Sequence, residues 1–513
     1  MKKTMYGFRK FEQSLQWTVA AGGALLLGSL LSGCTVGPKY HPPAMQAPAA
    51  YKESPASFKE NGPWTVAQPD DAMLRGDWWT VFHQPELNAL EQNLNINNQT
   101  IKQYFENFME ARALVREARS QYFPTIGTSP SYSRQRSSAN LTNSSSANVG
   151  QQSKLYSLPL EISWEPDLWG KIRNEVHGAE YSAQVSAADL ENERLSEQAA
   201  LAEYYFEVRG QDALIQLYAD TVKADQKALQ LTQAQYETGV GGKISVIEAQ
   251  NTLESAKSSA TNLGILRAQY EHAIAVLVGK PPADFTITDR PLVTAPPPIP
   301  IGVPSQLLER RPDVAAAERT MASVNAEIGV GYAAFYPSLT LSASGGFESS
   351  TAKHLLDWPS RFWSVGPSFS ETLYDGGLFR ATLHQYVATY NADLANYRQT
   401  VLTAFEQVED SLAAVRILSR QIDQQRTVVA SGRDALQLEM ARYQTGIDPY
   451  LDVVTLQTTL LTDQRTLASL QIEQMADAVQ LVQALGGGWN RSQLPTPSQV
   501  EAKPAAAETK IQK

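Results

Sequence analysis

Tyr236-Glu237-Thr238-Gly239 recurs 207 residues later as Tyr443-Gln444-Thr445-Gly446. Positions on both sides recur at the same offset: Gly170, Arg173, Val246, Gln250 and Gly279 match Gly377, Arg380, Val453, Gln457 and Gly486. Solenoid modules are only about 20–50 residues long, so this repeat is too long to be one of them. The 513 residues therefore indicate a duplicated half-protein rather than about three unrelated domains.

Each half contains a proline-free stretch of unusual length, at residues 172–238 and 378–445. Both stretches are rich in Ala, Gln, Glu and Leu, and each predicts one helix about 100 Å long at 1.5 Å per residue. A turn follows at 239–243 and at 446–449. Returning helices are predicted over 245–278 and 452–485, each ended by a glycine. Units 167–280 and 375–488 thus each hold a long helix, a turn and a return helix.

Alternating strands precede each long helix, and they predict β-hairpins over 124–166 and 337–374. Apolar residues occupy one face of each strand, whereas Ser and Gly crowd the other. A soluble sheet with one wet face is one interpretation. A membrane wall is favoured because aromatic residues such as Tyr156, Trp164 and Trp363 lie near strand ends. Four strands cannot close a barrel, since small barrels need about eight. Two copies would supply eight strands, and three copies twelve.

The remaining segments connect these units. Residues 76–123 are predicted to form helices that lead into the first hairpin, and 313–336 a helix that leads into the second. Pro312 stands at the first position of that second helix. A proline-rich linker covers 281–312, and residues 489–513 form a C-terminal tail that is predicted to be disordered after Pro495. Residues 34–75 are rich in Pro and Ala and indicate an extended tether.

The N-terminal residues have the pattern of a targeting signal. Basic residues precede a short apolar run, and residues 1–33 are predicted to be a secretory signal peptide. Leu31-Ser32-Gly33-Cys34 resembles the bacterial lipobox, in which the cysteine becomes acylated. The alternative is an ordinary signal peptide with a chance cysteine. Thr35 in place of Asp implies an outer-membrane address. Without residues 1–33, 39 basic residues face 52 acidic ones, and a net charge of −13 argues against a nucleic-acid partner.

Motifs for catalysis, metals and cofactors were not found. The six histidines, at 41, 83, 177, 272, 354 and 384, are scattered without metal-ligand spacing. Neither a Gly-x-Ser-x-Gly elbow nor a phosphate-cradling loop occurs. Glu161 and Glu165 share a strand face, where lumen carboxylates are favoured over an acid–base pair. We therefore expect no enzyme activity and no cofactor.

The chain resembles outer-membrane efflux lipoproteins of the TolC/OprM/NodT type. The motifs that carry this resemblance are Leu31-Ser32-Gly33-Cys34, Gly76-Asp77-Trp78-Trp79, Glu309-Arg310-Arg311-Pro312-Asp313-Val314, the paired Tyr-x-Thr-Gly turns and Tyr450-Leu451-Asp452-Val453-Val454. The resemblance implies a mixed α and β membrane protein. Its homotrimer would have a twelve-stranded β-barrel continuous with a twelve-helix periplasmic α-barrel and a mixed equatorial region. It also implies an exit duct for drugs and toxic compounds, joined by a periplasmic adaptor to an inner-membrane transporter of the RND type.

The resemblance also implies functional residues. Leu451, Asp452 and Thr455 would form the periplasmic gate, with Asp452 repeated around a threefold axis. Thr455 departs from the pattern, because relatives often have a second aspartate there. Asp448 and Lys243 are further candidates for turn contacts in the closed state. The alternative role for Asp452 is stabilisation of a helix N-terminus. The adaptor would contact the two turns, at Tyr236, Thr238, Gly239, Tyr443, Thr445 and Gly446.

Three other functions stay open at this point. The same duct could serve type I protein secretion. A structural lipoprotein could anchor envelope layers, and an envelope hydrolase could hide an unrecognised site. The lipobox and Arg310-Arg311-Pro312-Asp313 favour small-molecule export by gated passive passage.

Overall fold

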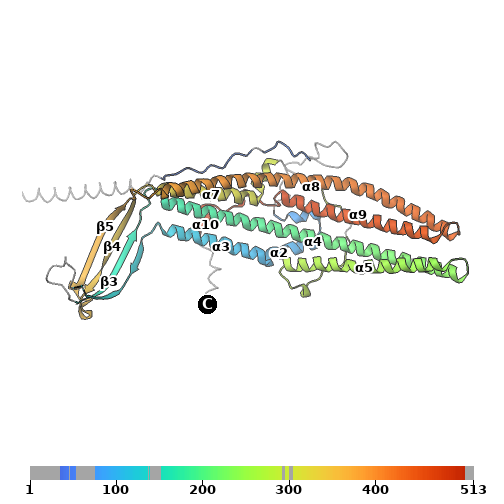
Figure 1. The fold of residues 1–513 in the computed structure, drawn as a ribbon, viewed down its shortest axis with the longest axis horizontal. Helices are drawn as coiled ribbons and strands as arrows, with labels where there is room; N and C mark the ends of the chain where they lie inside the picture. Colours follow the sequence, from blue (N-terminus) through green and yellow to red (C-terminus); the bar gives the residue numbers. More distant parts are fainter. Residues whose placement is uncertain are drawn as a thin grey trace, which may run out of the picture.

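The computed structural model describes residues 35–45, 47–53, 76–136, 138, 152–291, 295–299 and 304–502. The predicted signal peptide and Cys34 lie outside these residues. The molecule is elongated, with its strands gathered at one end and its helices running lengthwise to the other (Figure 1). Within the described residues, no helix combines the length and the apolar character needed to cross a membrane.

The prediction of two very long helices is confirmed. Helix α4 (Lys171–Glu237) and helix α8 (Leu378–Gln444) have 67 residues each. Their return helices, α5 (Lys243–Leu277) and α9 (Tyr450–Ala484), have 35 residues each. At 1.5 Å per residue, α4 and α8 are each about 100 Å long. Helices of this length form because neither stretch contains a proline to interrupt the hydrogen-bond ladder.

Shorter helices lead into each hairpin. In the first half these are α2 (Pro85–Asn97) and α3 (Gln99–Ser120); in the second they are α6 (Leu307–Arg310) and α7 (Pro312–Ala333). The Asn98 side chain caps α3 by accepting from the Ile101 N–H at 2.9 Å. Pro312 begins α7, as predicted. Helices α3 and α7 both have 22 residues and start 213 positions apart, so the internal repeat extends to helix boundaries.

The helices form one layered array. Helix α4 packs against α3 and α5 on one side and against α7 and α9 on the other, and α8 packs on α7 and α9. Figure 1 accordingly shows α8 along one long edge of the molecule and α3 and α5 along the opposite edge. Among the described residues, the helices at these two edges, α8 on one and α3 and α5 on the other, therefore pack against the array on one side only.

The strands form one antiparallel sheet. Strand β3 (Gln152–Trp164) pairs with β1 (Thr125–Thr128) and β2 (Ser131–Arg136) on one side. On its other side it pairs with β4 (Ser338–Ser349), which pairs with β5 (Arg361–Ser370). The first arm of the hairpin predicted over 124–166 is therefore divided into two strands. Pro130 lies at the break, where a residue without an N–H cannot donate to the ladder.

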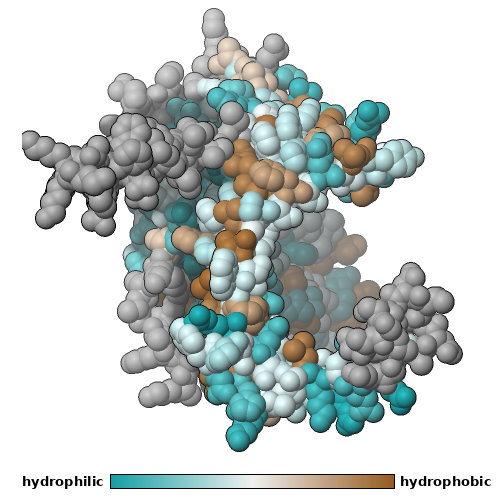
Figure 2. Space-filling view, turned by 90° about the vertical axis from the view of Figure 1, so that its left-hand side faces the viewer, coloured by the Kyte–Doolittle hydropathy of each residue, from teal (hydrophilic) through white to brown (hydrophobic). Residues whose placement is uncertain are grey.

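The register places most of the large apolar residues of the strands on one face, whereas Leu155 and Phe362 lie on the other. Leu158 lies opposite Phe347, and Ile162 opposite Ala343, which in turn lies opposite Val365. Serine and glycine fill the other face, as in the pair Ser163 and Ser342. Many large apolar side chains of this sheet, such as Ile126, Leu160 and Val365, are exposed in the isolated chain. Figure 2 looks onto this end of the molecule and shows apolar residues in a band through its middle.

The largest core lies midway along the helices. Helix η3 (Trp78–Phe82) inserts Trp78 and Phe82 against Tyr205 and Phe206 of α4. The Trp78 indole N–H donates to the Gln198 side chain at 3.1 Å. The Gly76-Asp77-Trp78-Trp79 motif is thus a packing element of this core.

Segments near both ends of the described residues pack on the helices. In the tether, Tyr51 is buried, and the Tyr40 hydroxyl donates to the Glu318 carboxylate of α7 at 2.6 Å. The expectation of disorder after Pro495 is wrong for residues up to 502, because 497–501 form helix α10 (Pro497–Glu501). Thr496 provides a capping box for α10, and Val500 is buried against Val115 and Ala183.

Candidate functional site

The two Tyr-x-Thr-Gly turns end the helical array, and we call this end of the molecule the tip. Gly239 and Gly446 both have positive φ, 78° and 74°, which a residue with a side chain rarely adopts. The next residues donate backwards: the Val240 N–H to the Gln235 carbonyl at 2.9 Å, and the Ile447 N–H to the Arg442 carbonyl at 3.0 Å. Both turns are therefore Schellman-type helix ends, which explains why the sequence repeats there.

The hydroxyl groups of the two motif threonines donate to backbone carbonyls of their own helices. The Thr238 hydroxyl donates to the Ala234 carbonyl at 2.9 Å, and the Thr445 hydroxyl donates to the Arg442 carbonyl at 2.9 Å. Thr238, Gly239, Thr445 and Gly446 are exposed at the tip.

The motif tyrosines differ. Tyr236 is 47% exposed, whereas Tyr443 is only 8% exposed. Tyr443 packs against Tyr450, with 5.1 Å between the ring centroids, and its hydroxyl donates to the Gln235 side chain of α4. Tyr443 therefore joins the two repeats inside the tip, while Tyr236 lies on the surface where a partner can contact it. The equal spacing of the repeat gave no sign of this difference.

The predicted gate residues lie together on the first turns of α9. Leu451, Asp452 and Thr455 are exposed, whereas Val453 between them is buried. The Thr455 hydroxyl donates to the Leu451 carbonyl at 2.8 Å. Residues at i, i+1 and i+4 share one side of a helix, so the three side chains point away from the protomer core together.

An ion pair that the sequence did not predict closes the α8–α9 turn. The Arg442 guanidinium donates to both oxygens of Asp448, one of them at 3.0 Å. These hydrogen bonds from Arg442 hold the pKa of Asp448 below its usual range. Asp448 was expected to make a turn contact, but nothing in the spacing indicated Arg442 as its partner.

A second unpredicted feature is a carboxylate inside the helical array near the tip. Asp225 of α4 is 3% exposed, and its Oδ2 has no hydrogen-bond partner. Burial raises its pKa to about 6. Its charge acts on Tyr450, whose pKa is raised to about 12, chiefly by burial and further by Asp225. A buried carboxylate thus acts electrostatically on Tyr450, which immediately precedes the predicted gate residue Leu451.

Helices α4, α8 and α9 enclose a groove of about 420 Å³ near the tip. Its lining is mainly apolar, with Leu231, Leu436, Met440 and Leu460, and Lys227 and Arg433 add positive charge. Gln444, the last residue of α8 before the turn, also lines this groove.

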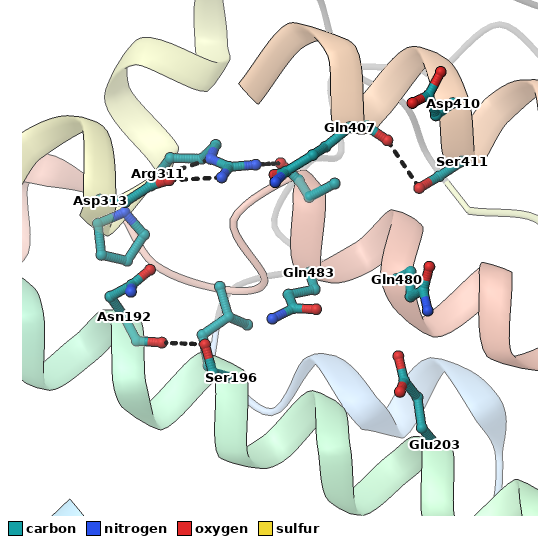
Figure 3. Close-up of a pocket in the computed structure, with 13 residues that line it drawn as sticks. Asn192, Ser196, Glu203, Arg311, Asp313, Gln407, Asp410, Ser411, Gln480 and Gln483 are labelled. Atoms are coloured by element: carbon teal, nitrogen blue, oxygen red, sulfur yellow. Dashed lines mark hydrogen bonds and ion pairs between the residues drawn. The ribbon is translucent and has the colours of Figure 1, made fainter. Parts of the chain in front are cut away.

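The Arg-Arg-Pro-Asp motif lies elsewhere, at the junction where α9 ends and α7 begins. Figure 3 shows a polar cavity there, of about 500 Å³. The Arg311 guanidinium donates to the Ala484 carbonyl at 2.9 Å and to Asp313 at 2.6 Å. Arg311 thereby satisfies a carbonyl at the C-terminus of α9 while bonding to the first turn of α7. The motif therefore connects the C-terminal end of α9 to the N-terminal end of α7 through the hydrogen bonds of Arg311.

This architecture of paired long helices on a small sheet is shared by known outer-membrane channels. The outer-membrane channel OprN superposes with a TM-score of 0.80 at 29% sequence identity, covering 89% of this chain and 100% of that one. The CmeC channel of Campylobacter jejuni gives the same TM-score at 22% identity and supports the fold alone.

The family follows from the sequence comparison. A model described as "Outer membrane efflux protein" matches residues 90–280 and again 303–487, which correspond to the two halves of the repeat. The antibiotic efflux pump outer membrane protein ArpC of Pseudomonas putida is 30% identical over 465 residues, covering 90% of this chain and 94% of ArpC. OprJ of Pseudomonas aeruginosa is 30% identical over 474 residues, covering 91% of this chain and 95% of OprJ. The chain belongs to the outer membrane efflux protein family. This membership confirms the predicted efflux function and the prediction that the chain is not an enzyme.

Proposed function

We propose that this chain forms the trimeric exit duct of a tripartite efflux system, through which small toxic molecules leave the cell by gated passive passage. A periplasmic adaptor and an inner-membrane transporter of the RND type complete the system, and the transporter supplies the energy. The observation that carries the proposal is a sheet with one mainly apolar face, joined directly to helices about 100 Å long. Such a molecule suits a sheet in the outer membrane and helices that extend into the periplasm.

The sheet supports the membrane position. Its apolar face includes Leu160, Val365 and Phe369, and these side chains are exposed in the isolated chain. Exposed apolar patches of this kind mark a surface that another apolar phase covers. Ser and Gly on the opposite face suit a water-filled lumen. Cys34, acylated as the lipobox implies, would anchor each subunit in the same membrane.

The open edges support the trimer. Strands β1 and β2 pair only with β3, and β5 pairs only with β4, within the described sheet. An unpaired edge inside a membrane leaves backbone N–H and C=O groups without partners, at several kcal/mol each. Three copies would close a barrel of twelve hairpin arms and a tube of twelve helices. This number rests on the resemblance noted above.

The tip suits a gate and an adaptor site. Leu451, Asp452 and Thr455 leave the protomer core on one side of α9, so three copies could meet around a common axis. Like charges at Asp452 would then repel one another and favour bound cations in the closed state. The exposed turns and the apolar groove beside Leu436 and Met440 offer the adaptor a contact surface.

The relatives favour small molecules as cargo. One P. putida relative, 30% identical over 465 residues, is a toluene efflux pump outer membrane protein, and ArpC belongs to an antibiotic efflux pump. Neither name refers to protein secretion. We therefore expect this chain to export toluene-like solvents and antibiotics.

Two measurements on the full-length chain test the proposal. The first is expression in a host that keeps an adaptor and an RND transporter but lacks its own exit duct. Restored growth on toluene or an antibiotic is expected. The second is the conductance of purified protein in planar lipid bilayers, where discrete openings are expected. A structural envelope lipoprotein would give neither result, and this outcome would overturn the proposal.

A further inference from the structure

Charged residues are unevenly placed in the sheet. The five described strands contain six charged residues, namely Arg134 and Arg136 of β2, Lys154 and Glu161 of β3, Glu348 of β4, and Arg361 of β5. The four basic residues lie near the strand ends that are farthest from the helices, where β2 ends and where β3 and β5 begin. The chain has a net charge of −10, so this end of the sheet is opposite in sign to the chain as a whole.

In the first hairpin the basic residues lie on the mainly apolar face. Arg134 lies directly opposite Lys154, and Tyr132 lies opposite Tyr156. Side chains alternate between the two faces of a strand, so Lys154 shares the face of Tyr156 and of the apolar residues further along β3. Arg136 is two positions beyond Arg134 and therefore lies on the same face.

The second hairpin has the same arrangement. Arg361 lies opposite Phe347, which lies opposite Leu158 on the apolar face. Glu161 and Glu348 are displaced by an odd number of residues from these positions and lie among the Ser and Gly residues of the other face. Within the described strands, the register thus separates all of the cations from both carboxylates.

We propose that Arg134, Arg136, Lys154 and Arg361 bind phosphate groups of the lipid in the outer leaflet, a phosphorylated glycolipid whose acyl chains cover the apolar face. We call these four residues the outer rim. This inference rests on the proposed position of the sheet in the outer membrane, with the helices in the periplasm, and it names the lipid that contacts the sheet.

The order of side chains along the apolar face matches the layers of a membrane. The Tyr132 and Tyr156 rings are 4.6 Å apart between centroids, and each lies two residues inward from a rim cation, about 7 Å at 3.4 Å per residue. Trp363 lies two residues inward from Arg361 and is 79% exposed. Aromatic residues gather where the acyl chains of a membrane meet its headgroups. The rim cations, one step further out, therefore lie at the level of the headgroups.

The rim cations have no anionic partner within the part of the chain that the structure describes. The Arg134 guanidinium donates instead to the neutral Gln152 side chain at 2.6 Å. Like charges directly opposite each other destabilise an antiparallel pair, and Arg134 and Lys154 have this relation. A phosphate bound between the two cations would remove the repulsion.

The chemistry of the rim suits a phosphorylated lipid. Three of its four residues are arginines, and a planar guanidinium can donate two parallel hydrogen bonds to one phosphate. The Arg361 guanidinium lies over the Trp358 ring, 3.9 Å from its centroid, which limits the orientations it can take. Inorganic phosphate would satisfy the cations alone, whereas a phosphorylated lipid would also cover the exposed apolar face beside them.

Lipid binding by the full-length protein tests the proposal. Purified protein in a non-ionic detergent is titrated with lipid A that carries two phosphates and, in parallel, with dephosphorylated lipid A, and native mass spectrometry gives the dissociation constants. The test variant is Arg134→Gln/Arg136→Gln/Lys154→Gln. Each cation beside an anionic lipid contributes about fivefold in affinity, so this variant should bind bisphosphorylated lipid A on the order of a hundredfold more weakly. Dephosphorylated lipid A should bind the variant and the wild type equally.

A matched control removes the same charge from the helices. Lys102→Gln/Arg116→Gln/Arg398→Gln changes three exposed basic residues and should bind lipid A as the wild type does. Arg361→Gln is the second test variant, because it leaves the first hairpin intact. It should weaken binding about fivefold even if the triple variant fails to fold. Conductance of each protein in planar bilayers reports the duct independently.

The outcomes are distinct. Undiminished lipid A binding in folded rim variants overturns the outer rim, as does an equal loss of binding in the helix control. Displacement of lipid A by an equal concentration of inorganic phosphate would indicate a simple anion site and would also overturn it. If the wild type conducts in each of these cases, the proposed duct stands. Wild-type protein without conductance overturns the proposed function itself.

Discussion

Replacing Asp225 with asparagine is expected to stabilise the tip at neutral pH. Asp225 is buried, its Oδ2 has no partner, and burial raises its pKa from 3.8 to about 6. Between these two pH values the folded protein holds a proton that the unfolded chain has already lost. Stability therefore falls as pH rises through this window, and the full penalty applies above about pH 6.

The magnitude follows from the shift. A difference of about 2.2 pKa units at 1.36 kcal/mol each is about 3 kcal/mol per Asp225. An asparagine side chain carries no charge at any pH, so Asp225→Asn removes this penalty above pH 6 and changes little near pH 4. An amide without partners has its own smaller cost, which makes about 3 kcal/mol the upper limit of the gain.

Hydrogen exchange of the backbone amides at the start of α9 measures the effect, because Tyr450 lies beside Asp225. After correction for intrinsic rates, protection at pH 7.5 is expected to rise by up to about a hundredfold in Asp225→Asn. The wild type gains protection between pH 7.5 and pH 5, and the variant does not. Asp220→Asn is the control, since Asp220 is an exposed carboxylate on the same helix, paired with Lys223 at 3.1 Å. A variant that keeps the wild-type pH dependence would refute the reasoning.

Three further changes test other parts of the structure. Tyr443→Phe removes the hydroxyl that donates to Gln235, so the tip should lose about 1 kcal/mol and bilayer conductance should rise; unchanged conductance would exclude this bond from gating. Gly210→Leu places a side chain against Ile472, and this overpacking should cost about 1–3 kcal/mol and lower the midpoint of thermal unfolding. The double variant Gly210→Leu/Ile472→Ala should partly restore that midpoint. Asp452→Asn should weaken block of the conductance by Mg²⁺, and equal block in both proteins would remove Asp452 from the proposed cation ring.

The helices were predictable because their signals are local and long. A proline-free stretch over 172–238 allows few structures other than one helix, and the repeat provides the same signal a second time. The break in the first hairpin arm also had a local signal, since Pro130 lies inside an alternating run. Helix α10 had one as well, because Thr496 and Gln499 have the spacing of a capping box.

The features missed at the tip had no local signal. Arg442 and Asp448 meet only because the turn reverses the chain between them. Tyr443 reaches Gln235, which is 208 positions away in the sequence. The burial of Asp225 depends on which face of α4 is covered by neighbouring helices, and the stretch around it resembles an ordinary polar helix. Three-dimensional packing decides all three contacts, and the sequence alone therefore did not indicate them.

The two copies of the repeat differ at two positions near the tip that carry titrating groups. The 207-residue offset relates Asp225 to Gly432 and Tyr450 to Lys243. The second copy of the repeat therefore has a glycine on α8 where the first copy has a buried carboxylate on α4. Because burial raises the pKa of Asp225 to about 6, protonation removes a charge that opposes burial and should tighten α9 against α4. The repeat provides no equivalent titrating group at Gly432 of α8, so this response to pH should be confined to the contact of α4.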